Sequence, residues 1–397
     1  MNSPLDQTTA AAPAADVDAA TQDSLRHPEA SGILTVDLDA LIANWRLLGS
    51  KSVPAECAAV VKADAYGCGL ERVTRALASA GCKTFFVATL DEARGVRRVA
   101  PNAVIYVLDG FFSHTGRTFV ELECRPVIGD IGELAEWEAF CRHRGLNGGA
   151  ALHIDTGMNR LGLSLAEAQA MIPRIEQGNH GITLVMSHLA CGELLDHPMN
   201  GRQLGAFREI ARHFSGVQAS LSNSSGIFLG PQFLFDLVRP GAALYGVNPT
   251  PEADNPMKQV VDVKARIVQV RQVERGETVG YGATWTARRP TRLAIIAAGY
   301  GDGYFRAAGG VDGVRSADVI IGGKRCQIAG RISMDLMAVD VTELAKPPRR
   351  GDLATLIGDG ITVDELSKPF GTIGYEVLTS LGSRYARIYK GGTTTPP

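Results

Sequence analysis

The N-terminal part of the chain alternates apolar runs of strand length with amphipathic helical patterns, from about Thr35 to Tyr245. Such alternation is typical of βαβ units that share a parallel sheet. About eight units fit into this stretch, the number that closes a (β/α)8 barrel. An open, doubly wound sheet is the alternative. The predicted strands are Cys57–Lys62, Thr84–Ala88, Val104–Leu108, Pro126–Ile128, Ala151–Asp155, Thr183–Ser187, Gln218–Ser222 and Ala242–Tyr245. The predicted helices are Leu70–Ala80, Asp91–Val99, Ile131–Arg144, Leu165–Gln177 and Gly201–Phe214.

The chain changes character after the loop Pro249–Lys258, which is rich in Pro, Asp, Glu and Asn. Val261–Val273 has the pattern of a long strand, and long helical patterns are nearly absent beyond it. Short strands between glycine-rich or charged turns are typical of an antiparallel sheet. We therefore predict an α/β protein in which a TIM-like (β/α)8 barrel over residues 31–257 precedes a mostly antiparallel β domain over residues 258–397. The short strands are expected at Leu293–Ala298, Asp318–Ile321, Lys324–Ile328, Met337–Val341 and Leu353–Ile357.

Composition and charge exclude several classes of function. The net charge of −2, without a strongly basic stripe, argues against nucleic acids and membrane surfaces as partners. Residues 1–30 are rich in Ala, Asp, Thr and Pro and have no apolar signal-peptide core, so we interpret them as a disordered tail. Together with seven scattered cysteines, this predicts a cytoplasmic protein. His188 and Cys191 have a metal-like spacing, but no second pair accompanies them, and we predict no metal site.

Lys62 stands at the end of the first predicted strand, directly after an apolar run. Burial of a lysine lowers its pKa and so favours the neutral amine. A neutral amine is a nucleophile that can form a Schiff base with a carbonyl group. The alternative interpretation is a surface lysine at a strand exit.

Basic and hydroxyl side chains follow several of the other predicted strands. The carboxyl ends of barrel strands carry the working groups of such enzymes, and the loops after the last two strands commonly bind phosphate. Ser224 and the backbone N–H groups near Gly241 and Ala242 are suited to hold a phosphate there. Combined with a lysine that forms Schiff bases, a phosphate site suggests pyridoxal 5′-phosphate. Taken singly, these residues also have structural interpretations: Arg160 as a surface arginine, His188 as a core histidine and Asn223-Ser224 as a turn or helix cap.

Eight motifs in order carry a resemblance to one family over roughly residues 33 to 390. The chain resembles alanine racemases, pyridoxal-phosphate enzymes built from a barrel and a β domain. The motifs are Val61-Lys-Ala-Asp-Ala-Tyr-Gly67, Asp155-Thr-Gly-Met-Asn-Arg-Leu-Gly162, Ser187-His188, Val238-Arg-Pro-Gly241, Tyr281-Gly-Ala-Thr284, Gly299-Tyr-Gly-Asp-Gly303, Gly330-Arg-Ile-Ser-Met-Asp335 and Gly374-Tyr-Glu376.

The resemblance implies a role for each matching residue. Lys62 would hold the cofactor and act as one catalytic base, and Tyr281, contributed by the other subunit of a homodimer, would act as the opposing base. Arg160 would lie near the phenolic oxygen of the cofactor, and Met334 would contact the substrate carboxylate. The remaining cofactor-binding positions are Tyr66, His188, Asn223, Ser224, Arg239, Gly241, Ala242 and Tyr375, and those near the entrance and the substrate are Tyr300 and Asp335.

The implied reaction interconverts L-alanine and D-alanine by two bases on opposite faces of the substrate. Lys62 would take the proton from the D-isomer and Tyr281 from the L-isomer. A free tyrosine has a pKa of about 10, which is high for a base at neutral pH. His188 and Arg239 are the expected neighbours that lower it. Arg239 would also donate a hydrogen bond to the ring nitrogen of the cofactor and leave that nitrogen unprotonated.

Two positions depart from the pattern of the family. Many relatives have a lysine, modified to a carbamate, where this chain has His153. Arg160 would then be oriented either by a hydrogen bond from His153 or by another bound anion. Ser333 stands where many relatives have cysteine, which should alter the sensitivity to inhibitors more than the reaction.

Three other functions share parts of this pattern. A non-catalytic pyridoxal-phosphate carrier would lack the second domain and the Tyr281 loop. A decarboxylase or D-amino-acid lyase of the barrel type would be expected to have an acid where Arg239 stands. A racemase of broader specificity would accept longer side chains, which Tyr375 at the pocket entrance should exclude, although slower activity on serine is expected. A biosynthetic and a catabolic role both stay open.

Overall fold

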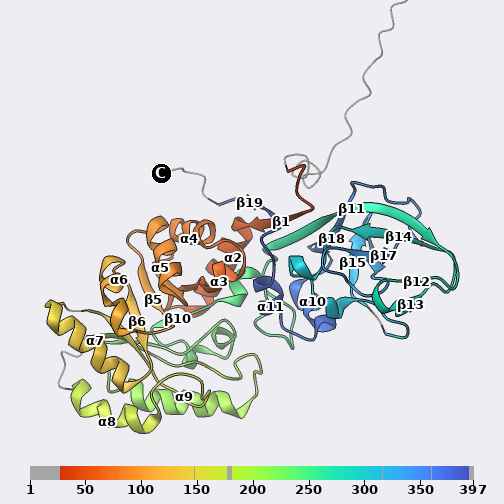
Figure 1. Ribbon diagram of the computed structural model, residues 1–397. Coiled ribbons are helices and arrows are strands. Elements are labelled where there is room, and N and C mark those ends of the chain that lie inside the picture. Colours follow the sequence, from red (N-terminus) through yellow and green to blue (C-terminus); the bar gives the residue numbers. More distant parts are fainter. Residues whose placement is uncertain (1–26, 147, 177–180, 315, 359, 393–397) are drawn as a thin grey trace, which may run out of the picture.

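The computed structural model describes residues 27–392 except 147, 177–180, 315 and 359. The chain forms two bodies, a barrel wrapped by helices and a body built mainly of strands (Figure 1). Most of the predicted disordered tail, residues 1–26, lies outside the described residues. His27 to Ala30 are described, and Arg266 Nε donates a hydrogen bond of 2.9 Å to the carbonyl oxygen of Ala30.

The first body contains a sheet of seven parallel strands that pair in the order of the sequence. Each strand is followed by helical structure, so the polar strand ends that were expected to form the site lie at one edge. The strands are β3 (Ala59–Val60), β4 (Thr84–Val87), β5 (Val104–Val107), β6 (Arg125–Ile128), β7 (Ala150–His153), β8 (Ile182–Met186) and β9 (Gln218–Ser220). The predicted (β/α)8-type fold is confirmed.

An eighth strand closes the ring. The strand β10 (Leu237–Val238) pairs in parallel with β2 (Glu56–Cys57), which continues almost directly into β3. On its other side, the N–H of Asp236 donates to the carbonyl oxygen of Ala219 at 3.0 Å, and that of Arg239 to Ser222 at 2.9 Å. These bonds connect β10 to the end of the seven-stranded sheet.

The prediction of the eighth strand at Ala242–Tyr245 is wrong. These residues form a short 3-10 helix, η4, that follows β10. All four are buried, which explains their apolar character. A short apolar run reports burial but does not distinguish a strand from a buried helical turn.

Five helices of the barrel lie within a few residues of their predicted positions, whereas those at Leu38–Ser52 and Gly116–Glu121 were not predicted. Capping side chains mark the starts of several of these helices. Thr89 and Glu92 form a capping box at the start of α5. The carboxylate of Asp130 accepts hydrogen bonds from the first N–H groups of α7. The helices are α2 (Leu38–Ser52), α4 (Leu70–Ser79), α5 (Leu90–Val99), α6 (Gly116–Glu121), α7 (Ile131–Arg144), α8 (Leu165–Glu176) and α9 (Pro198–Ala211).

The second body is organised around the long strand β11 (Val261–Val273), as its pattern predicted. Its eight-stranded sheet is antiparallel except for one parallel pair, which confirms the mostly antiparallel β domain. The other strands are β1 (Gly32–Asp37), β14 (Thr291–Ile296), β15 (Asp318–Ile321), β16 (Lys324–Gln327), β17 (Met337–Asp340), β18 (Leu353–Ile357) and β19 (Ala386–Lys390). A small hairpin, β12 (Thr278–Val279) with β13 (Trp285–Thr286), lies beside it.

The strand β1 connects the two bodies. It pairs antiparallel with β11 and parallel with β19, and it leads directly into α2 on the barrel. The sequence pattern did not indicate β1, β19 or the two helices α10 (Val363–Phe370) and α11 (Gly374–Thr379). The strand β1 therefore belongs to the second sheet. We propose that the barrel domain begins after β1 and that the boundary between residues 257 and 258 holds for the rest of the chain.

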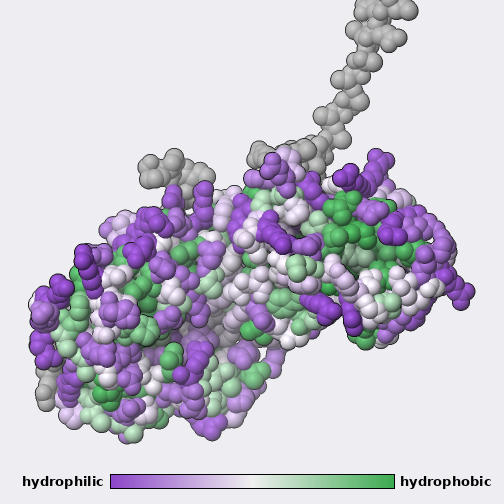
Figure 2. Space-filling model, in the orientation of Figure 1, coloured by the Kyte–Doolittle hydropathy of each residue, from purple (hydrophilic) through white to green (hydrophobic). Residues whose placement is uncertain are grey.

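The surface seen in Figure 2 is mixed, with an apolar area on the β body near β11 and β14. Exposed apolar side chains of this body include Val268, Tyr281, Met334 and Leu336. Within the described part of the chain, no helix combines the length and apolar character that a membrane crossing requires.

We expect the connection through β1 to be essential for stability. Leu34 of β1 is fully buried, so Leu34→Ala should lower the free energy of unfolding by about 2–5 kcal/mol. The matched control is Val268→Ala, because Val268 lies on the adjacent strand β11 with 38% of its surface exposed, and it should cost less than about 1 kcal/mol. Urea denaturation followed by circular dichroism measures both. Equal transition midpoints for the two variants would contradict this prediction.

Candidate active site

One cavity of about 540 Å³ at the carboxyl ends of the barrel strands contains most of the residues expected in the site. Its size lies within the usual range for ligand pockets. Residues that follow β3, near the start of the barrel, and β10, its last strand, meet here because the ring is closed. The lining includes Lys62, Tyr66, His153, Arg160, His188, Asn223, Ser224, Arg239, Gly241, Ala242 and Tyr375.

Four expected site residues lie elsewhere in the chain. Tyr281 is on η5 (Tyr281–Ala283) of the β body and is 70% exposed. Met334 and Tyr300 are also exposed, and Asp335 forms an ion pair of 2.6 Å with Arg384. None of the four lines the cavity that contains Lys62.

Lys62 begins an unusual turn directly after β3. The next four residues, Ala63 to Tyr66, all have positive φ values between 52° and 53°. This left-handed conformation costs about 1–2 kcal/mol per residue for L-amino acids. The turn is closed by hydrogen bonds of 2.9 Å from Ala65 N to Val61 O and from Gly67 N to Ala63 O. The strained backbone lies at the candidate site, where such strain is most often found.

The amine of Lys62 has a pKa below its usual value, as the sequence predicted. Burial is the main cause, and the nearby guanidinium of Arg160 lowers the pKa further. The carboxylates of Glu92 and Asp109 act in the opposite direction. The net result shifts the amine toward its neutral form, which is the nucleophilic and basic form.

One end of the cavity is lined by hydroxyl and backbone N–H groups. The buried Ser224 accepts hydrogen bonds through Oγ from Gly241 N at 3.0 Å and from Ala243 N at 3.2 Å. Gly241 is needed here because a Cβ at this position would lie 2.4 Å from the hydroxyl of Tyr66. The ring of Tyr66 also stacks on that of Tyr245, with centroids 4.7 Å apart.

Arg239 is buried at the base of the cavity and is nevertheless satisfied by hydrogen bonds. Its Nη2 donates to the carbonyl oxygen of Ser187 at 2.6 Å, and its Nη1 donates to the hydroxyl of Ser220. Burial lowers the pKa of Arg239 to about 9, so the guanidinium stays protonated at neutral pH. It can therefore donate a hydrogen bond but cannot serve as a base.

The two histidines of the cavity are neutral. Burial lowers the pKa of His153 to about 4, with further contributions from Arg239 and Arg160. The same causes, burial first, place the pKa of His188 well below its usual value. The acid nearest in sequence, Asp155, accepts hydrogen bonds from the backbone N–H groups of Gly157 and Met158. The idea that His153 orients Arg160 stays a prediction.

The donors and charges of this cavity fit an anionic ligand with an aldehyde group. Arg160 and Arg239 supply cationic side chains, Lys62 supplies an amine, and Tyr66, Ser224 and Tyr375 supply hydroxyl groups. Among the described residues, no three or more His, Cys, Asp or Glu side chains are grouped so that they could hold a metal ion. Asp109 also lines the cavity and was not predicted, although its place directly after a predicted strand was a signal. Ile373 and Thr379 also line it, and they were missed because the helical turn α11 was not expected.

Comparison with known proteins identifies the family. Models of the N-terminal and C-terminal domains of alanine racemase match residues 36–249 and 260–389. The chain belongs to the alanine racemase family. The resemblance inferred from the eight motifs is thereby confirmed.

Individual members of the alanine racemase family match nearly the whole chain. An alanine racemase from Methylobacterium nodulans is 50% identical over 364 residues, which cover 91% of this chain and 96% of that protein. Agrobacterium fabrum has a biosynthetic alanine racemase that is 44% identical over 364 residues (90% and 93% of the two chains) and a catabolic one that is 43% identical over 368 residues (91% and 92%). The crystal structure of alanine racemase from Bartonella henselae with covalently bound pyridoxal phosphate has a TM-score of 0.85 and 40% identity, and the match covers 91% of this chain and 100% of that one.

For this member of the alanine racemase family, we expect the neutral state of His153 to make stability depend on pH. As the pH falls from about 6.5 toward 4, the unfolded chain binds a proton at this histidine while the folded chain does not. Stability is therefore lost over this range. In His153→Gln, the urea midpoint of the ligand-free protein should fall less between pH 7 and pH 5 than in the wild type. An equal fall in both proteins would contradict the assignment.

Proposed function

We propose that the chain catalyses the interconversion of L-alanine and D-alanine, with pyridoxal 5′-phosphate attached to Lys62. The observation that carries this proposal is the position of Lys62: a lysine with a lowered pKa at the end of a barrel strand, in the same cavity as Arg239 and the Ser224 hydroxyl. Membership in the alanine racemase family supports the reaction, and the covalent cofactor of the Bartonella henselae relative supports the attachment.

The residues of the cavity suit each part of the cofactor. The hydroxyl groups of Tyr66, Ser224 and Tyr375 and the backbone N–H groups near Gly241 and Ala242 would hold the phosphate. Arg239 would donate to the ring nitrogen, and Arg160 would lie near the phenolic oxygen. His188 and Asn223 complete the surroundings of the ring. When bound, the cofactor withdraws electrons from the amino acid joined to it and so acidifies the α-hydrogen.

Inversion of the α-carbon needs a proton removed on one face and a proton returned on the other. The neutral amine of Lys62 would serve one face. Tyr281 would serve the opposite face, and it would come from a second copy of the chain, because in its own chain it lies outside the cavity with 70% of its surface exposed. His188 and Arg239 would then lie near the hydroxyl of Tyr281 across the subunit interface.

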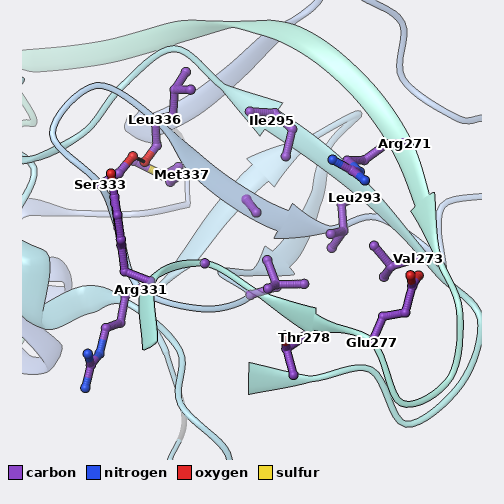
Figure 3. Close-up of a pocket in the computed structure, with 15 residues that line it drawn as sticks. Arg271, Val273, Glu277, Thr278, Leu293, Ile295, Arg331, Ser333, Leu336 and Met337 are labelled. Carbon is purple, nitrogen blue, oxygen red and sulfur yellow. Dashed lines mark hydrogen bonds between the residues drawn. The ribbon is translucent and has the colours of Figure 1, made fainter. Parts of the chain in front are cut away.

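An exposed apolar pocket next to Tyr281 supports a homodimer. Leu293, Ile295, Leu336 and Met337, which Figure 3 labels, line this pocket of about 490 Å³ together with Tyr281. Exposed apolar areas of this kind mark interaction surfaces more often than plain surface. A second copy that covers this face would bring Tyr281 and Met334 to its own cavity, so that each site is shared.

The Tyr281 loop and the segment that carries Met334 pack closely on each other, which suits a joint role at such an interface. A Cβ on Gly330 would lie 2.5 Å from the carbonyl oxygen of Val279, and one on Gly280 would lie 3.2 Å from the N atom of Arg331. Close backbone contact of this kind is possible because both positions are glycine. We propose that the two segments form one unit that presents Tyr281 and Met334, with Tyr300 and Asp335 beside the substrate path.

Alanine is the proposed substrate because Tyr375 lines the cavity and would exclude long side chains by overlap. Slower activity on serine, or a racemase of broader specificity, is the alternative within the same mechanism. A non-catalytic pyridoxal-phosphate carrier is disfavoured because the match to the C-terminal domain of the family covers residues 260–389. The biosynthetic and catabolic relatives are about equally similar to this chain, so either physiological role agrees with the sequence. A cytoplasmic location is proposed from the free, mostly buried cysteines.

The reaction itself is tested with L-alanine in deuterated water. The protein reconstituted with pyridoxal phosphate should form D-alanine that carries deuterium at the α-carbon, and Lys62→Ala should abolish both signals. The matched control is Lys83→Ala, since Lys83 is an exposed lysine that directly precedes β4 and so lies at the opposite end of the strand. Cofactor binding without exchange on any amino acid would support the carrier instead.

The shared site is tested by mixing two inactive variants. Lys62→Ala and Tyr281→Phe should each be inactive alone, because each lacks one base. After dissociation and random reassociation, half of the dimers are hybrids with one intact site, so activity should return to about a quarter of the wild-type level. If the mixture stays as inactive as its components, Tyr281 does not act across subunits.

A further inference from the structure

Glu92, which the site described above does not include, contacts the backbone of the turn that follows Lys62. It is the third residue of α5, the helix after the next strand of the barrel. Its Oε1 accepts hydrogen bonds from Ala63 N at 2.6 Å and from Asp64 N at 3.4 Å. Its Oε2 accepts from Ala88 N at 2.8 Å and from Thr89 N at 3.4 Å. One carboxylate thus joins two neighbouring loops at the end of the barrel that carries the site.

The N–H groups that Glu92 satisfies belong to the left-handed turn. Ala63 and Asp64 are its first two residues, so their N–H groups have no carbonyl partner one turn earlier, as at the start of any helix. A carboxylate is a strong acceptor for such groups. The contact therefore stabilises a backbone conformation that L-amino acids adopt reluctantly and that places Lys62 in the cavity.

Glu92 also interacts with the amine of Lys62. Its negative charge, together with that of Asp109, opposes the effects of burial and of Arg160 on this amine. The same carboxylate is therefore coupled both to the backbone that carries the lysine and to the charge of the lysine. A residue with only a helix-capping role would have neither connection.

We propose that Glu92 is a positioning residue for the reaction proposed above: its carboxylate holds the turn at residues 63–66 so that Lys62 is directed at the cofactor. The proposal rests on the proposed function. It assigns to Glu92 an effect on cofactor attachment and turnover that exceeds its contribution to the stability of the fold.

The chain contains a matched control for this carboxylate. Glu133 is the third residue of α7 and makes the same kind of bridge two βα units later. Its Oε2 accepts from Gly129 N at 2.8 Å, and its Oε1 accepts from Phe111 N, at 2.5 Å, in the preceding loop. The loop that Glu133 holds has no cofactor-binding lysine. Replacing Glu133 therefore removes an equivalent bridge between two loops but no hydrogen bond to the turn after Lys62.

The experiment compares Glu92→Ala and Glu92→Gln with Glu133→Ala and Glu133→Gln. For each variant we would measure the melting temperature, the dissociation constant of pyridoxal phosphate by absorbance, the fraction of Lys62 that borohydride traps with the cofactor, and kcat and KM for alanine. All four variants should melt at lower temperature than the wild type. Glu92→Ala should in addition weaken cofactor binding at least about tenfold, as expected for the loss of charge-assisted hydrogen bonds, and should lower kcat more than it changes KM.

The conservative variant separates positioning from folding. Glutamine retains one acceptor oxygen, so Glu92→Gln should lie between the wild type and Glu92→Ala in cofactor binding and trapping, and both Glu133 variants should bind the cofactor within about twofold of the wild type. If Glu92→Ala does not fold, the comparison of Glu92→Gln with Glu133→Gln in cofactor binding and trapping tests the proposal. Equal cofactor affinity, trapping and kcat in the Glu92 and Glu133 variants would overturn the proposal. A wild-type protein that binds and traps the cofactor but does not racemise alanine would instead refute the proposed function. The proposal for Glu92 would still be tested in that case, because cofactor affinity and trapping are measured without turnover.

Discussion

The backbone hydrogen bonds between β10 and β2 are the constraint on which the site depends. They close the parallel sheet into a ring, so the carboxyl ends of the first and last strands become neighbours. Lys62 after β3 and Arg239 after β10 then share one cavity although they are far apart in the sequence. An open sheet would leave these two strands at opposite edges and would divide the site between them.

The same cavity concentrates positive charge in a buried place. Burial of a cation without a partner is costly, and the chain limits this cost in different ways. Arg239 keeps its charge because the carbonyl oxygen of Ser187 and the hydroxyl of Ser220 accept hydrogen bonds from its guanidinium group. His153 and His188 become neutral instead, since burial and the neighbouring guanidinium groups lower their pKa values. What remains is a site suited to an anion, with a lysine whose pKa is lowered.

The two bodies of the chain contribute to catalysis in different ways under the proposed mechanism. The barrel carries Lys62 and the groups that hold the cofactor. The β body presents Tyr281 and Met334 on an exposed, partly apolar face. The β body is not formed by one continuous stretch of the chain, because β1 joins its sheet before α2 begins the barrel. A strand near each end of the described chain, β1 and β19, pairs side by side in the second sheet next to the start of α2.

Alternation of apolar and polar residues was enough to predict the barrel, the β domain and most element positions, because such patterns report burial directly. The motifs, most of them at strand ends, also identified ten of the residues that line the cavity, since parallel strands present their carboxyl ends at one edge. The run Ala242–Tyr245 was misassigned because a buried helical turn is as apolar as a strand. The pairing of β1 with β11 and β19, the left-handed turn after Lys62 and the bridge made by Glu92 depend on contacts between distant or neighbouring units. Local patterns carry no information about such contacts, so only the folded chain could decide them.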